Sequence, residues 1–189
     1  PQVWAEKPIT DEQAAQFRAA RAQSTTGPAI VHASYLINPC SAKPDVREKG
    51  VLALASEARR CDQLGAELLV FHPGSPGDMG ADEGVRLVAD ALVQAVSGSK
   101  NATLLVENTA GQGASIGHEF EQLAAILERA DCGDRAGVCL DTAHALAAGY
   151  PLDDPEAVDK VLDELDAIVG IERLLALHLN DSKTKRGSR

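Results

Sequence analysis

The sequence has few of the features that mark membrane proteins and aromatic-rich cores. Aromatic residues make up 3% of the 189 residues, so a core must be built from Ala, Val, Leu and Ile, which is typical of α/β proteins. No apolar run approaches the roughly 20 residues needed to cross a bilayer, and no secretory leader opens the chain. We therefore expect a soluble protein that has no membrane partner.

Cysteine spacing and net charge narrow the class further. The four cysteines have no CxxC spacing, which predicts a reduced intracellular protein, cytoplasmic or, in a eukaryote, nuclear. The formal net charge of −10 argues against a general nucleic-acid coat, although it still allows a local basic face. Lys183, Lys185, Arg186 and Arg189 gather near the end of the chain. From composition alone, a solvated charged tail is the simpler interpretation of this run.

Five short segments predict buried β-strands, because they are continuously apolar rather than alternating. They are AIVH (29–32), LLVFH (68–72), TLLVE (103–107), AGVCLD (136–141) and LLALHLN (174–180). Strands that are covered on both faces imply parallel pairing, with helices on the connections.

Helical patterns fill the intervals between these strands. Thr10 and Gln13 fit a capping box, Gly65 ends the next helix, and Asp154 before Pro155 opens the last one. The strand ends fall 34 to 40 residues apart, and no GxGxxG turn marks a dinucleotide site. The predicted fold is α/β, a (β/α)8 TIM barrel. Because a full barrel has eight units in about 250 residues, we expect residues 1–189 to form a single domain that is an incomplete barrel, about five βα units truncated at both ends.

Each predicted strand ends in a side chain that can bind a metal: His32, His72, Glu107, Asp141 and His178. In a parallel barrel these ends lie on one rim, so we expect the side chains to meet. A single histidine at a strand end is more often a hydrogen-bonded core or loop residue, but five strands of five favour a shared site. His144 adds a sixth candidate. His118 is excluded, as an expected solvent-facing residue of a first helical turn.

Imidazole and carboxylate ligands together favour zinc or another borderline divalent ion, with manganese as the alternative, over magnesium or calcium. Three histidines and two carboxylates exceed the needs of one tetrahedral ion. The sequence therefore predicts a cluster of two or more ions. Such clusters stabilise both the attacking and the leaving oxygen in phosphoryl hydrolysis.

Five motifs follow one another over nearly the whole chain: HASYLIN, FHPGS, VENTAGQG, GVCLDTAHALAAGY and LHLNDSK. In this order and spacing they resemble the endonuclease IV family of apurinic/apyrimidinic endonucleases. The resemblance implies a (β/α)8 barrel with three zinc ions that cleaves the DNA backbone 5′ to an abasic site in base excision repair. The implied partner is abasic double-stranded DNA. The oligomeric state is left open, with a monomer expected for a complete barrel.

The resemblance also implies roles for single residues. Glu107 would act in catalysis as the bridging ligand that holds a nucleophilic hydroxide together with the metals. The implied metal ligands are His32 and His72 for the first zinc, Glu107 between the first and second, Asp141 and His178 for the second, and His144 for the third.

Residues that contact DNA are implied in the same way. Tyr35 and Leu36 match a pair that family members push into the duplex, although without the family they would be ordinary loop packing. Lys183, Lys185 and Arg186 would contact phosphates beside the cluster.

The chain also departs from the family pattern. Family members continue beyond residue 189 with an Asp-x-His pair for the third zinc and a later glutamate for the second. We therefore expect this chain to hold the first site better than the second, and the third poorly, and its own activity is left open. Two alternatives remain: a metal-dependent sugar isomerase or epimerase on a related barrel, and a non-catalytic DNA-binding fragment of the family.

Overall fold

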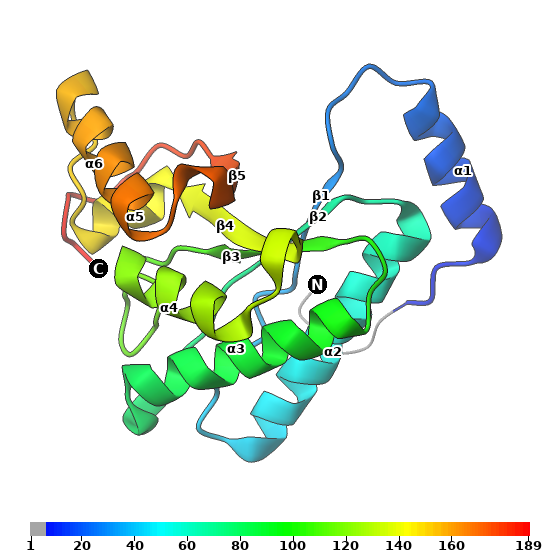
Figure 1. The fold of residues 1–189 in the computed structure, drawn as a ribbon, viewed down its shortest axis with the longest axis horizontal. Helices are drawn as coiled ribbons and strands as arrows, with labels where there is room; N and C mark the ends of the chain where they lie inside the picture. The colour runs from blue at the N-terminus through cyan, green and yellow to red at the C-terminus, as the bar shows by residue number, and fades with distance from the viewer. Residues whose placement is uncertain (1–6) are drawn as a thin grey trace.

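Five parallel strands form one sheet in the computed structural model, which describes residues 7–189 (Figure 1). The strands are β1 (Ile30–His32), β2 (Leu68–Phe71), β3 (Thr103–Glu107), β4 (Ala136–Asp141) and β5 (Leu174–His178). Their order in the sheet is their order in the sequence. A doubly wound sheet would reverse direction at a switch point, so this order is that of a TIM barrel. The predicted five-strand part of a barrel is confirmed.

Six α-helices connect and cover the strands within the described residues. They are α1 (Asp11–Ala22), α2 (Pro44–Leu64), α3 (Ala81–Ser97), α4 (Phe120–Ala130), α5 (Thr142–Ala148) and α6 (Pro155–Ile168), with 3-10 turns η1 (Gly77–Met79), η2 (Gly133–Arg135) and η3 (Ile171–Arg173). Figure 1 shows α2, α3 and α4 packed side by side along one side of the sheet, with α1 beyond α2 and α6 beyond α4. The helices therefore cover the outer face of the half-barrel.

The helix ends follow the local sequence signals. Thr10 Oγ1 accepts a hydrogen bond from the backbone N–H of Gln13 at 3.2 Å, and the Gln13 side chain accepts one from the backbone N–H of Thr10 at 3.0 Å. Gly65 has φ 69°, a left-handed conformation that glycine adopts without steric cost, and it ends α2. The Asp154 carboxylate accepts from the backbone N–H of Ala157 at 2.9 Å at the start of α6. All three predicted helix boundaries are confirmed.

One helix differs from expectation. The sequence patterns assign no helix directly after Asp141, but Thr142–Ala148 forms α5. Asp141 is its N-cap, because the carboxylate Oδ1 accepts from the backbone N–H of His144 at 2.8 Å. Seven residues that follow directly from a strand are too few to show an amphipathic stripe, so the pattern contains no signal for this helix.

The strands bury two apolar clusters, one on each face. The larger cluster lies between the sheet and the helices and includes Leu69, Phe71, Leu104, Val106, Val138 and Leu140. The smaller cluster lies on the inner face of the half-barrel and consists of Val70, Leu105, Cys139 and Ala176. Successive residues of a strand point to opposite faces, so residues two positions further along share a face. The residues that follow the inner cluster at this spacing are His72, Glu107, Asp141 and His178. The sheet thus directs these side chains to the inner rim.

The pairing of β4 with β5 contains one irregularity. Val138 pairs with Leu174, but Cys139 pairs with Ala176, so Leu175 is an extra residue in β5. This is a β-bulge. Beyond the bulge, Asp141 pairs with His178.

The cysteines are present as thiols, most of them buried. All four cysteines are free, and burial raises the pKa of the Cys40, Cys61 and Cys139 thiols to about 12. These thiols therefore stay protonated at neutral pH. Within residues 7–189, no helix has the length and apolar character needed to cross a membrane.

Candidate metal centre

Glu107 lies at the centre of a group of four histidines. Its Oε2 atom is 2.8 Å from His32 Nε2 and 3.1 Å from His72 Nε2, and its Oε1 atom is 3.1 Å from His178 Nδ1 and 3.3 Å from His144 Nδ1. The carboxylate is only 1% exposed, whereas each imidazole is partly open to solvent. Residues that are far apart in the sequence thus meet at the carboxyl ends of the strands.

The imidazole rings form two groups that share Glu107. His32 and His178 make one group with Glu107, and His72 and His144 make the other; in each group the potential ligand atoms lie within 4.8 Å of one another. The resemblance instead assigned His32 and His72 to one ion. Which imidazoles share an ion therefore stays a prediction, but Glu107 has a central position in both arrangements.

Asp141 is the second buried carboxylate at this rim and is 3% exposed. Its oxygens lie 3.7 Å from His178 Nδ1 and 3.8 Å from His144 Nδ1. The Asn180 side chain also donates to Asp141 Oδ2 at 2.6 Å. All six predicted metal ligands are therefore brought to one place.

Main-chain carbonyls set the orientation of two of the rings. His32 Nδ1 lies 2.8 Å from the carbonyl oxygen of Ala33, and His144 Nδ1 lies 3.0 Å from that of Asn108. A carbonyl only accepts, so each Nδ1 must carry the hydrogen. In the neutral ring, Nε2 then keeps the lone pair that a metal needs. Histidines that bind metals are held in this way in many proteins.

The electrostatics of the centre couple the carboxylate to the rings. Burial by itself raises the pKa of Glu107, but hydrogen bonds from His144, His32 and His72 outweigh it and hold the pKa far below its usual range. The hydrogen bond to Glu107 raises the pKa of His32 and that of His144 against the opposing effect of burial. The carboxylate is thus ionised, and it attracts positive charge to its surroundings.

The donor set fits a borderline divalent cation. A buried carboxylate is costly unless a cation or hydrogen-bond donors compensate it. Among the ion pairs of residues 7–189, those of Glu107 are made with imidazoles and not with Lys or Arg. Neutral imidazoles beside an ionised carboxylate are the ligands that zinc prefers.

The predicted DNA-contacting pair lies beside this centre. Tyr35 is 63% exposed and lines a cavity of about 300 Å³ together with His72, His144 and other residues, while Leu36 is half-buried. Sequence reasoning missed Asn38, which lines the same cavity. Its side chain donates to the carbonyl of Ser75 at 3.1 Å and accepts from the backbone N–H of Ser75 at 3.1 Å. Asn38 thus joins the loop of Tyr35 to the loop that follows His72.

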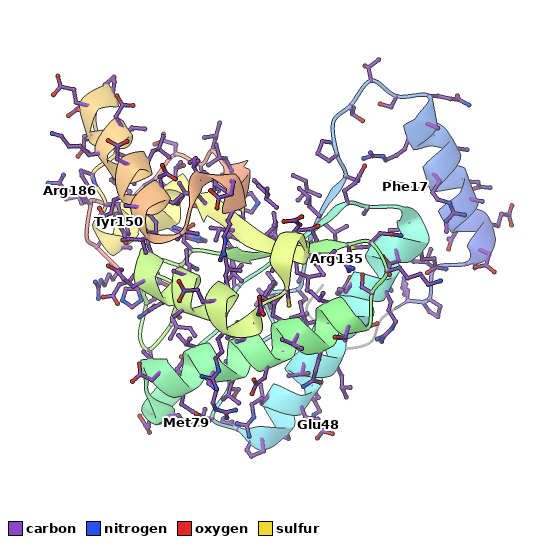
Figure 2. All side chains as sticks on the ribbon, in the orientation of Figure 1. Phe17, Glu48, Met79, Arg135, Tyr150 and Arg186 are labelled. Atoms are coloured by element: carbon purple, nitrogen blue, oxygen red, sulfur yellow. The ribbon has the colours of Figure 1, made fainter. Side chains whose placement is uncertain are left out.

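The basic run at residues 183–189 is not a free tail, contrary to the simpler interpretation of its composition. The backbone N–H of Gly187 donates to the carbonyl of Leu146 at 2.9 Å, and that of Arg189 donates to Ala147 at 3.1 Å, so the segment packs along α5. Arg186 lies beside α6 in Figure 2 and pairs with Asp153 at 3.2 Å.

Two of the residues predicted to contact DNA, Lys183 and Lys185, are exposed on this segment.

The position of one histidine differs from expectation. His118 was expected to face solvent, but its side chain is only 16% exposed and its Nδ1 lies 3.0 Å from the carbonyl oxygen of Ser115. It precedes α4 rather than lying in its first turn. Its exclusion from the centre still agrees with the structure, because neither group of potential ligand atoms includes it.

Comparison with known proteins agrees with the fold. The model of the xylose isomerase-like TIM barrel family matches residues 1–189. The class of the protein is therefore that of a xylose isomerase-like TIM barrel.

Individual relatives narrow this class. The chain is 44% identical over 188 residues to a probable endonuclease 4 of Chloroflexus aggregans, covering 98% of the chain and 66% of the relative. It is 43% identical over 188 residues to a probable endonuclease 4 of Haloarcula marismortui, covering 100% of the chain and 67% of the relative. A solved structure of endonuclease IV from Thermus thermophilus superimposes with a TM-score of 0.85 at 39% identity, over 99% of the chain and 65% of that structure. Within the TIM barrel class, the chain belongs to the endonuclease IV family, and it spans about two thirds of the length of these relatives.

Proposed function

We propose that this protein is a zinc-dependent phosphodiesterase that cleaves DNA 5′ to abasic sites in base excision repair. One observation carries the proposal: a single buried carboxylate, Glu107, is surrounded by four imidazoles at the carboxyl rim of a parallel barrel sheet. In TIM barrels this rim is where catalysis takes place. The endonuclease 4 relatives at 43–44% identity support the choice of reaction.

The proposed cofactor is a cluster of up to three zinc ions, with manganese as an alternative. Its ligands would be His32, His72, Glu107, Asp141, His144 and His178. Bound zinc would lower the pKa of water to near neutrality and polarise phosphate oxygens. Glu107 would act as the shared ligand, because each of its oxygens already contacts two imidazoles.

The chain's own residues would bring the substrate to this centre. Tyr35 and Leu36 would enter the duplex at the damaged nucleotide, and the exposed position of Tyr35 beside the cavity supports this role. An abasic nucleotide costs less to extrude than a paired base, since its pairing and stacking are already lost. Lys183 and Lys185 would bind flanking phosphates, and Arg186 would join them by exchanging Asp153 for a phosphate.

Incision of a defined duplex tests the proposal. The metal-free chain, with and without added zinc, would be mixed in excess with an end-labelled duplex that contains a tetrahydrofuran abasic analogue, and with an undamaged duplex as control. We expect zinc-dependent cleavage of the abasic duplex alone, with a 3′-hydroxyl end that a polymerase can extend. A zinc-loaded chain that binds the abasic duplex and leaves it intact would contradict the proposal.

The sugar isomerase or epimerase alternative is not favoured, because the relatives at 43–44% identity are named endonuclease 4. Turnover of a sugar without cleavage of DNA would restore it. A DNA-binding fragment without catalysis would bind the abasic duplex equally well with and without zinc.

We also propose that residues 1–189 act as one domain, since a single sheet runs through the described residues. The four free cysteines support a reducing compartment, the cytoplasm or a eukaryotic nucleus. A monomer is the proposed state on DNA, and light scattering of the DNA complex would check it.

A further inference from the structure

Asn108 is a buried asparagine directly after Glu107, and it is only 2% exposed. Its side-chain Oδ1 accepts a hydrogen bond from the backbone N–H of Asp141 at 2.6 Å, and its Nδ2 donates to the carbonyl of Asp141 at 3.1 Å. Both main-chain groups of one residue are thus bound by one side chain. A primary amide suits this task, because it offers a donor and an acceptor side by side.

The main chain of Asn108 makes two further contacts with the same part of the molecule. Its N–H donates to the carbonyl of Cys139 at 3.2 Å, which extends the pairing of β3 with β4. Its carbonyl oxygen lies 3.0 Å from His144 Nδ1, so the ring hydrogen lies on Nδ1 and leaves Nε2 as the free nitrogen. Asn108 therefore contacts both Asp141 and His144.

These two contacts bear on two of the six proposed metal ligands. Asn108 holds the main-chain N–H and C=O of Asp141, and so it restrains the position of the Asp141 side chain. Oδ1 of that side chain accepts from the backbone N–H of His144 at 2.8 Å. A shift of Asp141 would therefore also shift the start of α5, where His144 lies. Ligands that are fixed before the metal arrives bind it more tightly, because less conformational freedom is lost on binding.

We propose that Asn108 is a positioning residue of the metal centre, which fixes the carboxylate of Asp141 and selects the tautomer of His144 that presents Nε2 to a cation. The proposal deepens the proposed function and rests on it for the identity of the bound ion. It assigns Asn108 no contact with the substrate or with the reacting atoms.

Two measurements on the uniformly 15N-labelled chain test this role. The first is the tautomer of His144 in the metal-free protein, from the 15N shifts of its two ring nitrogens. The second is zinc affinity, from competition with a chromophoric chelator. The variants are Asn108→Ala, which removes both side-chain bonds, and Asn108→Asp, which keeps the shape and the acceptor but replaces the Nδ2 donor. Asn101→Ala is the matched control, because Asn101 is an exposed asparagine before the opposite end of β3.

We expect wild type and Asn101→Ala to show the Nδ1–H tautomer and equal zinc affinity. Asn108→Ala keeps the main-chain carbonyl that faces His144 Nδ1 but frees it from Asp141, so this carbonyl can move and the ring should show a mixture of tautomers. Zinc affinity should fall by about 10- to 100-fold, the usual effect of removing a group that orients a metal ligand. Asn108→Asp should bind zinc more weakly than wild type. It serves as the test variant if Asn108→Ala does not fold. A folded variant with the wild-type tautomer and wild-type zinc affinity would overturn the proposal. Failure of the wild-type chain to bind zinc would instead count against the proposed function, while the tautomer would still decide the role of Asn108.

Discussion

A carboxylate lies at each end of strand β3, and the two have different partners. Near the amino end, the Asp62 carboxylate accepts from the backbone N–H groups of Lys100, Asn101 and Ala102 at 2.6 to 3.2 Å and from the Ser99 hydroxyl at 3.1 Å. At the carboxyl end, Glu107 contacts four imidazoles instead.

Arg135 also binds the main chain of the segment before the amino end of β3. Arg135 donates to the carbonyls of Ala102 and Lys100 at 3.0 Å and to that of Ser99 at 3.3 Å, and it lies among the connecting segments in Figure 2. Main-chain partners cannot leave without unfolding the loop, so this end is structural. Imidazoles keep a second nitrogen and can exchange a proton for a cation, so the carboxyl end is suited to chemistry. The comparison predicts that changes at one end alter stability and changes at the other alter metal binding and activity.

The largest effect is expected from Glu107→Gln. The substitution keeps the shape but removes the charge that both imidazole groups share, so zinc affinity and incision should each fall by more than about 100-fold, because even groups behind the ligands contribute 10- to 100-fold. Chelator competition and the abasic duplex assay measure the two effects. Glu121→Gln, at an exposed glutamate of α4, is the control. Retention of zinc by Glu107→Gln would remove the distinction between the two ends.

The next effect is expected from Asp62→Ala. It removes an acceptor from three main-chain N–H groups, so unfolding free energy should fall by about 2 kcal/mol or more, whereas zinc affinity of the folded chain stays the same. Urea unfolding gives the first quantity and chelator competition the second. Asp90→Ala, which breaks the exposed pair with Arg86, should cost less than about 1 kcal/mol. A loss of zinc affinity in Asp62→Ala would show that the ends are coupled.

Acid should remove the contribution of Asp62. Burial raises the pKa of this carboxyl, but hydrogen bonds from Lys100, Asn101, Ala102 and Ser99 outweigh it and lower the pKa below its ordinary value. A lowered folded-state pKa stabilises the protein above the unfolded-state pKa of about 3.9, and this stabilisation is lost as pH falls through the folded-state pKa. The difference in unfolding free energy between wild type and Asp62→Ala should therefore be constant between about pH 5 and 7 and shrink below it. A difference that grows in acid would refute this assignment.

The smallest effect is expected from Tyr35→Ala. Loss of one stacking aromatic side chain should weaken binding of the abasic duplex by about 10-fold, at the low end of about 1–3 kcal/mol for each base stacked. Zinc content should not change. Phe17→Ala is the matched control, because Phe17 is a partly exposed aromatic residue on α1, away from the rim (Figure 2). Equal losses in the two variants would show a general surface effect.

Much of the fold could be predicted because its signals are local. The five strands end within two residues of their predicted bounds, since fully covered strands form uninterrupted apolar runs. Helix ends at Thr10, Gly65 and Asp154 follow from backbone chemistry that a few neighbouring residues decide. Helix α5 escapes prediction because its N-cap, Asp141, is also a strand end with a ligand side chain, and its seven residues form no amphipathic stripe.

The candidate centre could be predicted in outline but not in detail. The five strand ends gave its members, because equal spacing in a parallel barrel brings them to one rim. The grouping of the imidazoles depends on side-chain rotamers, which spacing does not determine. Asn108 and Asn180 were missed because their partners are the main chain and side chain of Asp141. A signal for Asn108 was available: a polar amide that directly follows a buried strand needs a buried partner.

The extra residue Leu175 has a consequence for how related genes can vary in length. Regular pairing onward from Val138 and Leu174 would set Leu177 opposite Asp141 and turn His178 to the outer face, so the bulge is what brings His178 to the rim. A relative that lacks one codon at Leu175 can therefore keep the ligand by pairing without a bulge. Strand β3 pairs regularly with both neighbours and holds no such spare residue, so the same loss there would turn Glu107 away from the rim. Single-residue gaps in homologous sequences should therefore be tolerated in β5 and selected against in β3.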